Sequence, residues 1–559
     1  MVERLLRIIH KEWSGLHEAA FLLGTFALLS QVLGLVRDRL LAHLFGAGEV
    51  LDVYYAAFRT PDLVYASIAS FVAVTVLIPF ILERIEGNDL GRARQFLNSV
   101  FSVFVVAMLF VLVALYVLTP YLANYIVPGF STVLKGQFVE LTRILLWSPI
   151  LLGLSNLFGS VTQTFRRFTV FALGPVLYNV GIIIGVLFLL PIFGINGLVY
   201  GVLLGAAFHM LIQIPVLVRE RCVPRFTTSV SWDDVRKLIA LSLPRTLALS
   251  STHFVTILLV ALASGVDTGA IAVFTLALNL QSIPLSIVGM SYSVAAFPTL
   301  ARLWGREDRE EFLLQVTTAM RHIMFWSFPA IALFIVLRAQ IVRTVLGSGA
   351  FDWTATRLTA AALALFALSA VAQSLQLLFL RAHYAMGETR VALRNSLIGA
   401  VVTIVAALFL REIFRTEALF RYFLESLLRV EDLPGTEVLI LPLAYSIGMI
   451  TSVIYFLIGM QQRFPDLYEK VRRSFLHTFT VSVIMGSAAY HSLQFFGKNL
   501  ETSTFFGIFF QGVIATFVAI ATGIFMLNLM GNREIREIWT SLHHRFWKTK
   551  PIATEQEGL

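Results

Sequence analysis

Apolar stretches of about 20 residues recur along this chain of 559 residues, and they constrain its fold more than any other feature. A stretch of that length lets one helix cross the hydrocarbon core of a bilayer. Hydrophobic residues make up 57% of the chain and charged residues only 14%, whereas soluble domains carry roughly 25% charged residues. Because backbone groups inside lipid must be hydrogen-bonded within the protein, we predict an all-α integral membrane protein.

The apolar stretches predict about fourteen transmembrane helices. The second, eighth and tenth are longer than a bilayer requires, so we expect them to tilt, bend or extend past it. An amphipathic segment at residues 1–18 is predicted to lie in the interface before the first span. The predicted spans are 19–45, 52–83, 96–119, 137–163, 169–190, 195–218, 237–263, 269–301, 313–337, 355–385, 391–410, 437–460, 475–496 and 504–529.

Basic residues concentrate in alternate loops, which predicts the orientation of the chain. The net charge is +9, and in membrane proteins such an excess lies on the cytoplasmic side. The pattern places both termini in the cytoplasm, with a cytoplasmic linker at 219–236 and a tail at 530–559. Two outer segments deviate, namely 338–354, with Arg338 and Arg343, and 411–436, which mixes basic and acidic residues. We predict an extended loop with an amphipathic interfacial helix at 411–436. No nucleic-acid partner is expected.

Four sequence pairs at nearly one offset indicate an internal repeat. Pro79 and Pro298 end similar spans, and Pro61 matches Pro284. The PGF of 128–130 precedes GAF of 349–351 by about 220 residues, and FRRFTVFAL precedes YAMGETRVAL by the same distance. Six spans separate the copies, so they share one orientation, as in parallel repeats around a cleft. We therefore predict two six-helix lobes around a central cavity, an N-lobe at 19–218 and a C-lobe at 237–460. Two further helices follow at 475–529.

Charged residues inside the predicted spans are candidates for a substrate site. Each costs about 2.5–3.5 kcal/mol to insert and marks function by default. Arg37 and Arg59 are the sharpest pair, because arginine offers bidentate donors and a permanent charge to an anionic head group such as a pyrophosphate. Arg245 is a third candidate. The alternative is structural: Arg37 pairs with Asp38 or Asp52, and Arg59 with Asp62, to hold helices together.

Other residues carry weaker predictions. Asp52 suits a helix cap or an ion-pair partner as well as a ligand contact. Pro61 and Pro284 remove backbone hydrogen bonds in long helices and are predicted hinges. The histidines show no metal-binding spacing, and neither HExxH nor a phosphate-binding glycine loop occurs, so no metal, no cofactor and no enzymatic activity is expected.

Residues 30–63, SQVLGLVRDRLLAHLFGAGEVLDVYYAAFRTPDL, resemble the opening of the MurJ/MviN lipid II flippases. These flippases belong to the multidrug/oligosaccharidyl-lipid/polysaccharide exporter superfamily. Further matches are RRFTVFALGPVLYN at 166–179, GAFDWTATRLTAAALALFALS at 349–369 and RAHYAMGETRVALR at 381–394. The resemblance covers about residues 20–465. It implies fourteen helices, two lobes around a cationic cavity, and flipping of an undecaprenyl-pyrophosphate-linked peptidoglycan precursor.

The resemblance carries over only part of the family's charged cavity. Its first-span arginine and the aspartate after GAG correspond to Arg37 and Asp52. Seven other charged positions of the family are neutral here, namely Gln31, Tyr65, Ala66, Ser70, Leu278, Asn279 and Ser282. The cavity of this chain would then rely on Arg59, Arg245, Asn279 and Gln281, with Asp38 beside Arg37.

We therefore expect a flippase that moves lipid II from the cytoplasmic to the outer leaflet of the bacterial cytoplasmic membrane by alternating access, in the service of peptidoglycan synthesis and cell shape. A polyprenyl-pyrophosphate-linked sugar and membrane lipids are the expected partners, and cell-wall synthesis proteins are a further class. Two alternatives stay open. One is a flippase for another lipid-linked glycan, and the other is a transport-inactive MurJ-like scaffold for cell-wall assembly.

Overall fold

The computed structural model describes residues 16–68, 74–86, 90–497 and 504–537. The side chains of residues 16–21, 74–76, 86, 90, 244 and 245 also lie outside the described part. Most of the predicted interfacial segment 1–18 and the tail beyond residue 537 therefore fall outside the description.

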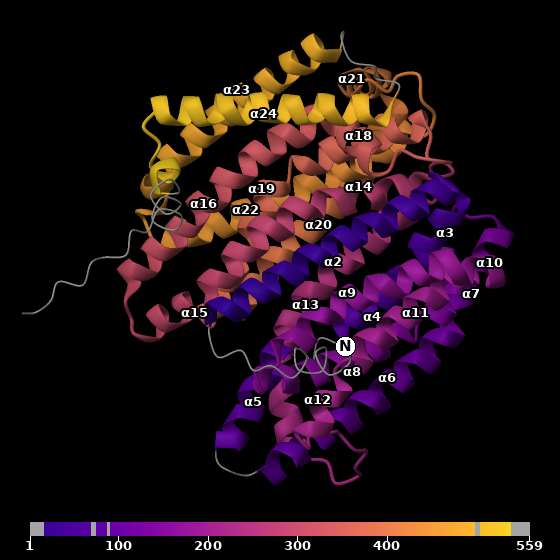
Figure 1. Cartoon of the computed structure of the whole chain (residues 1–559), viewed down its shortest axis with the longest axis vertical. Helices are drawn as coiled ribbons and strands as arrows, with labels where there is room; N and C mark the ends of the chain where they lie inside the picture. The colour runs from indigo at the N-terminus through magenta and orange to yellow at the C-terminus, as the bar shows by residue number, and fades with distance from the viewer. Residues whose placement is uncertain (1–15, 69–73, 87–89, 498–503, 538–559) are drawn as a thin grey trace, which may run out of the picture. The chain divides into compact units, whose positions relative to one another are not determined.

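The described chain is helical, and its helices group into two compact units. Unit 1 comprises residues 1–283, 342–369 and 387–452, and unit 2 the remainder. Helices of unit 1 (Figure 1) are α2 Leu16–Phe45, α3 Glu49–Ala57, α4 Arg59–Ser67, α5 Val74–Glu86, α6 Leu90–Ile126, α7 Thr132–Leu145, α8 Ser148–Thr164, α9 Phe168–Ile184, η2 Gly185–Leu189, α10 Leu190–Phe193, α11 Asn196–Leu211, α12 Ile214–Arg219, α13 Trp232–Ala263, α14 Ala270–Pro284, α18 Trp353–Ala367, α20 Thr389–Thr416, α21 Ala418–Leu428 and η4 Thr436–Leu439. Unit 2 holds η3 Leu285–Met290, α15 Ser291–Gly305, α16 Arg309–Val336, α19 Ala370–Ala385, α23 Leu467–Gly497 and α24 Phe505–Leu529, while α17 Arg338–Val345 and α22 Ile440–Arg463 belong to both.

The all-α membrane fold is confirmed. Ten helices in the described residues are long and apolar enough to cross a membrane, or eleven if the bent pair α18 and α19 forms one span. They coincide with eleven of the predicted spans. The first, second and thirteenth predicted spans are not among them, so the number fourteen stays a prediction.

The second predicted span, 52–83, is not one helix. It is divided into α3, α4 and α5, with a break at Phe58 and a second interval at 69–73 that lies outside the described residues. Pro61 is the third residue of α4, and in the first turn of a helix a missing N–H costs nothing because that group has no partner within the helix. The break before Pro61 thus replaces the bend that we predicted inside a continuous helix.

Unit 1 has a buried apolar core around α6, and polar side chains on α6 hydrogen-bond the segment that follows α12. Phe96, Leu97 and Phe104 of α6 pack with residues of α5 and α8. Of the predicted linker 219–236, residues 220–231 form an irregular segment over α6, and α13 begins at Trp232. Side-chain oxygens of α6 accept backbone N–H groups of this segment. Asn98 accepts from Arg225 at 2.7 Å, Ser102 from Thr227 at 2.8 Å and Ser99 from Ser231 at 3.1 Å. The polar row on α6 therefore holds the linker in place.

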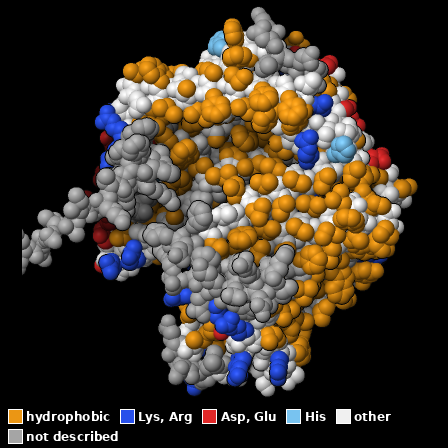
Figure 2. Space-filling model, in the orientation of Figure 1, with side chains coloured by type: hydrophobic (Ala, Val, Ile, Leu, Met, Phe, Trp, Pro, Cys, Tyr) orange, Lys and Arg blue, Asp and Glu red, His pale blue; other side chains and the backbone are white. Residues whose placement is uncertain are grey.

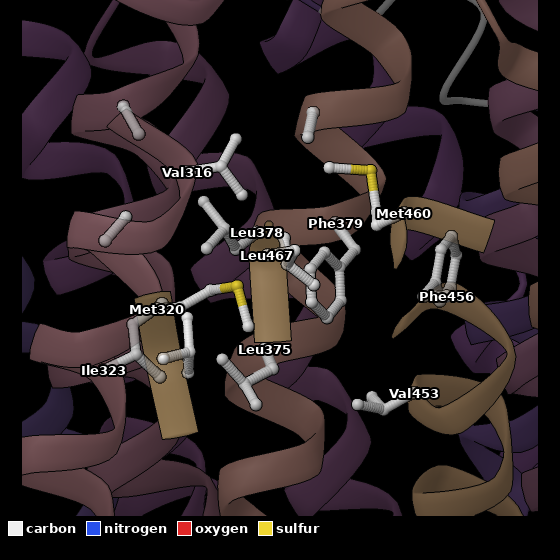
Figure 3. Close-up of a cluster of buried hydrophobic side chains, with 14 of the residues drawn as sticks. Val316, Met320, Ile323, Leu375, Leu378, Phe379, Val453, Phe456, Met460 and Leu467 are labelled. Atoms are coloured by element: carbon white, nitrogen blue, oxygen red, sulfur yellow. The ribbon is translucent and has the colours of Figure 1, made fainter. Parts of the chain in front are cut away.

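Unit 2 has its own apolar core, which joins α15, α16, α19 and the ends of α22 and α23. Figure 3 shows Met320 and Ile323 facing Leu375, Leu378 and Phe379, with further side chains from α22 beside them. These side chains are almost fully removed from solvent, and apolar burial of this kind contributes about 25 cal/mol per Å². This core therefore stabilises unit 2 from within its own helices.

Large apolar side chains also cover the outside of the protein. Phe110 is 75% exposed, Phe517 69% and Phe188 63%, and Figure 2 shows hydrophobic side chains over much of the visible face. Soluble monomers rarely expose contiguous apolar surface on this scale. Together with the apolar helices, this surface indicates a multi-pass protein that contacts lipid.

Two loops at the repeat offset make reciprocal contacts within unit 1. Gly129 of the PGF loop donates its N–H to the Ser264 hydroxyl at 3.2 Å, and a Cβ at Gly129 would overlap the Ser264 carbonyl. A Cβ at Gly349 of the GAF loop would overlap the His43 carbonyl, and the Ala350 N–H donates to that oxygen at 2.9 Å. Gly129 precedes Gly349, and His43 precedes Ser264, by nearly the offset of the repeat. Each copy therefore binds the other through the same loop.

The helices that follow these loops begin alike. Ser131 caps α7 by accepting the Leu134 N–H, and Asp352 caps α18 by accepting the Ala355 N–H at 2.7 Å. Both are short polar side chains that accept from the backbone three residues later, as N-caps do. The equivalence of loop and cap supports the internal repeat.

Replacing either loop glycine should destabilise the protein. Gly129→Ala adds a Cβ against the Ser264 backbone, and Gly349→Ala adds one at φ +58° against His43. We expect each to cost about 1–3 kcal/mol and to lower the apparent melting temperature of the purified protein in detergent. Gly136→Ala in α7 is the matched control, because no other atom lies within 4 Å of the position that its new Cβ would take. An unchanged melting temperature for both loop variants would contradict the reciprocal contact.

Candidate functional site

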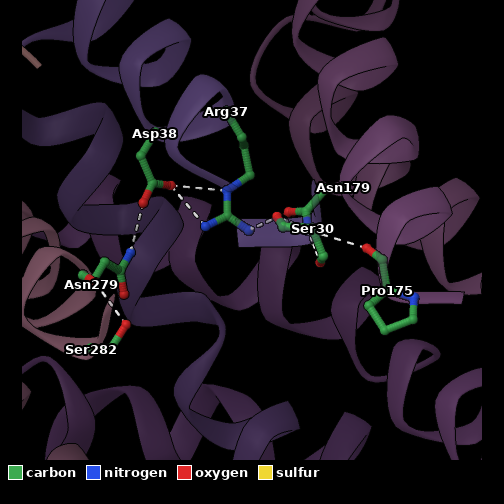
Figure 4. A network of polar contacts seen from close by, with 7 residues as sticks. All are labelled: Ser30, Arg37, Asp38, Pro175, Asn179, Asn279 and Ser282. Atoms are coloured by element: carbon green, nitrogen blue, oxygen red, sulfur yellow. Dashed lines mark hydrogen bonds and ion pairs between the residues drawn. The ribbon is translucent and has the colours of Figure 1, made fainter. Parts of the chain in front are cut away.

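Arg37 belongs to a polar network that joins three helices of unit 1 (Figure 4). On α2, its Nε donates to the Asp38 carboxylate at 2.9 Å and its Nη2 approaches the same oxygen at 2.8 Å. Its Nη1 donates to the Asn179 side-chain oxygen on α9 at 3.2 Å. Asn179 in turn donates to the backbone and hydroxyl oxygens of Ser30. Arg37 is thus held by Asp38 and by a neighbouring helix.

Asp38 extends the network to α14. Its second carboxylate oxygen accepts the Asn279 side-chain N–H at 3.0 Å, and the Asn279 backbone carbonyl accepts the Ser282 hydroxyl at 2.7 Å. The Asp38 side chain is 5% exposed, whereas that of Arg37 is 23% exposed. The carboxylate is therefore a buried structural partner, and the guanidinium keeps access to a ligand.

Asp52 serves as a helix cap. Its carboxylate oxygens accept the backbone N–H groups of Gly269 at 2.6 Å and Ala272 at 2.8 Å, at the start of α14. The N-terminus of a helix offers unsatisfied N–H groups and a positive dipole end, so a buried carboxylate is stabilised there. Of the roles predicted for Asp52, the structure displays the cap, and its carboxylate oxygens are occupied by the backbone of α14 rather than free for a ligand.

Arg59 is less neutralised than Arg37. Its Nη2 donates to the Thr275 hydroxyl on α14 at 3.0 Å, and its Nε is buried without a hydrogen-bond partner. Asp62 follows one turn later on α4, but no ion pair joins the two side chains in the described structure. A buried N–H without an acceptor costs about 1–3 kcal/mol. A ligand that accepts hydrogen bonds would therefore compensate Arg59 more than Arg37, which already has Asp38 and Asn179 as acceptors.

The structure describes the remaining candidate residues to different extents. Gln281 on α14 is 1% exposed, and both polar atoms of its amide lack a partner among the described residues. Arg245 lies within α13, which packs against α4, but its side chain is outside the described part. Pro284 ends α14, where the helix continues into the π-helical turns of η3. The hinge roles of Pro61 and Pro284 stay predictions.

Sequence reasoning missed three neutral side chains: Ser30 and Asn179 in the Arg37 network, and Thr275, which contacts Arg59. Asn179 is a strongly polar residue in the middle of the apolar span 169–190, and such residues commonly hydrogen-bond across membrane helices. That signal could have found it, but a search for charged residues alone passes over an amide. Thr275 carries no signal, because threonine is common in apolar spans.

Two arginines and a set of neutral donors can bind an anion in this region. Arg37 uses three of its five N–H donors on the protein atoms described above, and Arg59 has a buried Nε to satisfy. Arginine donors suit the oxygens of a phosphate or pyrophosphate. The network therefore offers a partly compensated cationic site between helices rather than a row of free charges.

The apolar helices, the lipid-facing surface and this polar network inside a helical unit define a multi-pass membrane transporter. The sequence model of the family described as lipid II flippase MurJ matches residues 41–511. The chain belongs to this family.

Relatives are similar to this chain in sequence, and solved structures are similar to it in fold. A probable lipid II flippase MurJ of Rhizobium tropici is 26% identical over 401 residues, which cover 69% of this chain and 74% of the relative. A probable lipid II flippase MurJ of Buchnera aphidicola is 23% identical over 522 residues, or 90% of this chain and 96% of the relative. The fold resembles a lipid II flippase MurJ in an inward closed conformation, with a TM-score of 0.72 at 21% identity over 91% of this chain and 99% of that one. An inward-facing multidrug transporter of the MOP superfamily follows at 0.63, with 16% identity over 79% of this chain and 96% of that one.

The Arg37 and Asp38 pair should show strong coupling. Asp38→Leu leaves the half-buried guanidinium without its counter-charge and Asn279 without its acceptor, whereas the double variant with Arg37→Leu removes the charge as well. We expect the two effects to be non-additive by about 0.5–3 kcal/mol, measured by unfolding of the four proteins in detergent. The exposed pair Arg533 and Glu537 is the control, and its coupling should be close to zero. Additive effects at Arg37 and Asp38 would contradict the pairing.

Proposed function

We propose that this protein flips lipid II from the cytoplasmic to the outer leaflet of the bacterial cytoplasmic membrane by alternating access. The match of the lipid II flippase family over residues 41–511 carries the proposal. Proteins of that name among the relatives, in Rhizobium tropici and Burkholderia cenocepacia, support the same cargo. The protein acts as a transporter and not as an enzyme, with both termini in the cytoplasm.

In this proposal, Arg59 and Arg37 bind the pyrophosphate of the cargo. Arg59 gains an acceptor for its buried Nε, and Arg37 adds the donors that Asp38 and Asn179 leave free. Asn279 and Gln281 lie on α14, which contacts Arg59 through Thr275 and contacts Asp38, the partner of Arg37, through Asn279. Gln281 brings a buried amide without partners, which can bind a sugar hydroxyl or water in the loaded state. Arg245 is proposed as a third cation on α13.

The polyprenyl chain stays in lipid while the head group crosses. This division follows from transfer costs: each buried CH₂ gains about 0.8 kcal/mol in an apolar environment, whereas a charged head group needs polar partners throughout its path. Exposed apolar side chains on the helices give the polyprenyl chain a lipid-like surface to contact. The neutral positions Gln31, Leu278 and Ser282 would leave the site with fewer charges than its relatives.

Loss of Arg59 should slow transport strongly without preventing insertion. Arg59→Ala removes a charge-assisted contact worth about 1.5–3 kcal/mol, so we expect flipping in reconstituted vesicles to slow by about tenfold or more. Arg59→Lys should retain part of the activity, because it keeps the charge but not the fork of donors. Arg37→Ala should also lose transport. Arg473→Ala, an exposed arginine on α23, is the control.

A bacterium depleted of its own lipid II flippase provides the second arm. Rescue by the wild-type protein supports the cargo, and failure despite normal insertion and folding would favour the transport-inactive scaffold. Wild-type flipping of a different lipid-linked glycan, but not lipid II, would replace the proposed cargo. Undiminished flipping by Arg59→Ala and Arg37→Ala would remove the proposed site.

A further inference from the structure

A cavity of about 550 Å³ opens between α6, α7 and α11 of unit 1, and no residue of the Arg37 network lines it. Its lining includes one cation, one anion and three aromatic side chains: Arg143, Glu140, Tyr116, Trp147 and Tyr200. Neither the transport proposal nor the repeat uses any of them. Charged side chains within predicted spans are functional candidates, and here both charges stand beside aromatic side chains.

Arg143 is positioned by Tyr116 of α6. Its Nε donates to the Tyr116 carbonyl at 3.0 Å, and its guanidinium carbon lies 4.4 Å from the centre of the Tyr116 ring. The stacking and the hydrogen bond fix the plane of the guanidinium while its two terminal nitrogens keep their donors. Arg143 thus presents a rigid, oriented cation to the cavity.

Glu140 lies one turn earlier on α7 and is positioned by a different helix. Its carboxylate accepts the Asn196 side-chain N–H at the start of α11 at 2.6 Å. Side chains three apart on a helix are close enough to pair, yet no ion pair joins Glu140 and Arg143 among the described contacts. Each charge is held by its own neighbour, so the two stand side by side without neutralising each other.

The cavity lies beside the first turns of α11 and beside the last third of α6. Asn196 begins α11, and the exposed Tyr121 and Tyr125 continue along α6 beyond Tyr116. Trp147 is 49% exposed and Tyr116 46% exposed. Tryptophan and tyrosine concentrate at membrane–water interfaces because their rings are amphipathic. With both termini in the cytoplasm, as proposed, this is the outer interface.

We infer that this cavity binds the head group of a zwitterionic, amine-bearing phospholipid such as phosphatidylethanolamine. The phosphate contacts Arg143, the ammonium contacts Glu140, and the acyl chains lie against Trp147 and Tyr200. Charge complementarity selects this occupant: an anionic lipid leaves Glu140 without a counter-charge and adds repulsion, and a neutral glycolipid satisfies neither charge. A single head group reaches both side chains, since only two carbons separate its charged groups.

Trp147 fluorescence tests the inference directly. The protein is reconstituted in vesicles that contain one lipid with brominated acyl chains, which quench nearby tryptophan, and the Trp147 signal is the difference between wild type and Trp147→Phe. Three brominated lipids are compared: phosphatidylethanolamine with both charges, phosphatidylglycerol with the phosphate alone, and a neutral glycolipid with neither. The wild-type exchange constant should favour phosphatidylethanolamine over phosphatidylglycerol by about tenfold, the effect of one charge-assisted contact.

Two variants separate the two contacts. Glu140→Gln should bring the exchange constant of phosphatidylethanolamine against phosphatidylglycerol close to one. Arg143→Ala should remove the preference for phosphatidylglycerol over the glycolipid. Lys135→Ala, an outer charge on α7 that does not line the cavity, should change neither. Equal quenching by all three lipids in the wild type, a preference for phosphatidylglycerol, or unchanged constants in both variants would overturn the inference. None of these outcomes tests the proposed flipping of lipid II, because the assay does not involve the cargo.

Discussion

A guanidinium inside an apolar helical unit needs acceptors, and the Asp38 carboxylate is the acceptor on which the centre of unit 1 depends. It compensates Arg37 on the same helix and draws Asn279 of α14 to its other oxygen. Arg37 then reaches Asn179 of α9. One buried anion thereby sets the register of three helices, since a shift along any of them would leave a charge or an amide without its partner. The same arrangement limits how much positive charge Arg37 can offer to a ligand.

Much of the fold could be predicted from the sequence, because long apolar stretches permit few structures. The interiors of the helices could be predicted from hydropathy, whereas the breaks inside the spans could not. The span 52–83 is continuous in hydropathy, yet it breaks at Phe58, three residues before Pro61, where the sequence predicted only a bend within one helix. Nor does hydropathy indicate that α20 continues to Thr416, six residues past its predicted end. Backbone breaks inside spans depend on tertiary contacts that partner helices supply, and hydropathy does not record those contacts.

The candidate site was likewise predictable only in part. Charged residues inside spans are conspicuous, and Arg37, Asp38 and Arg59 all belong to the polar region of unit 1. Their ranking was not predictable, because it depends on whether a particular carboxylate lies within reach. Asp38 forms an ion pair with Arg37, and Asp52 accepts backbone N–H groups at the start of α14. The Nε of Arg59 is left buried without an acceptor. Neutral partners such as Asn179 become visible only when helices distant in the chain are brought together.

The reciprocal loop contacts bear on the origin of the chain. Gly129 lies against Ser264 and Gly349 against His43, so each half supplies both a loop and its receptor. Two identical half-length chains, side by side and in the same orientation, would make that contact twice around a twofold axis, as in an isologous dimer. A gene fusion would then preserve an interface that already existed between separate subunits. The present-day asymmetry, with a serine in one receptor and a histidine in the other, is what divergence after such a fusion would leave behind.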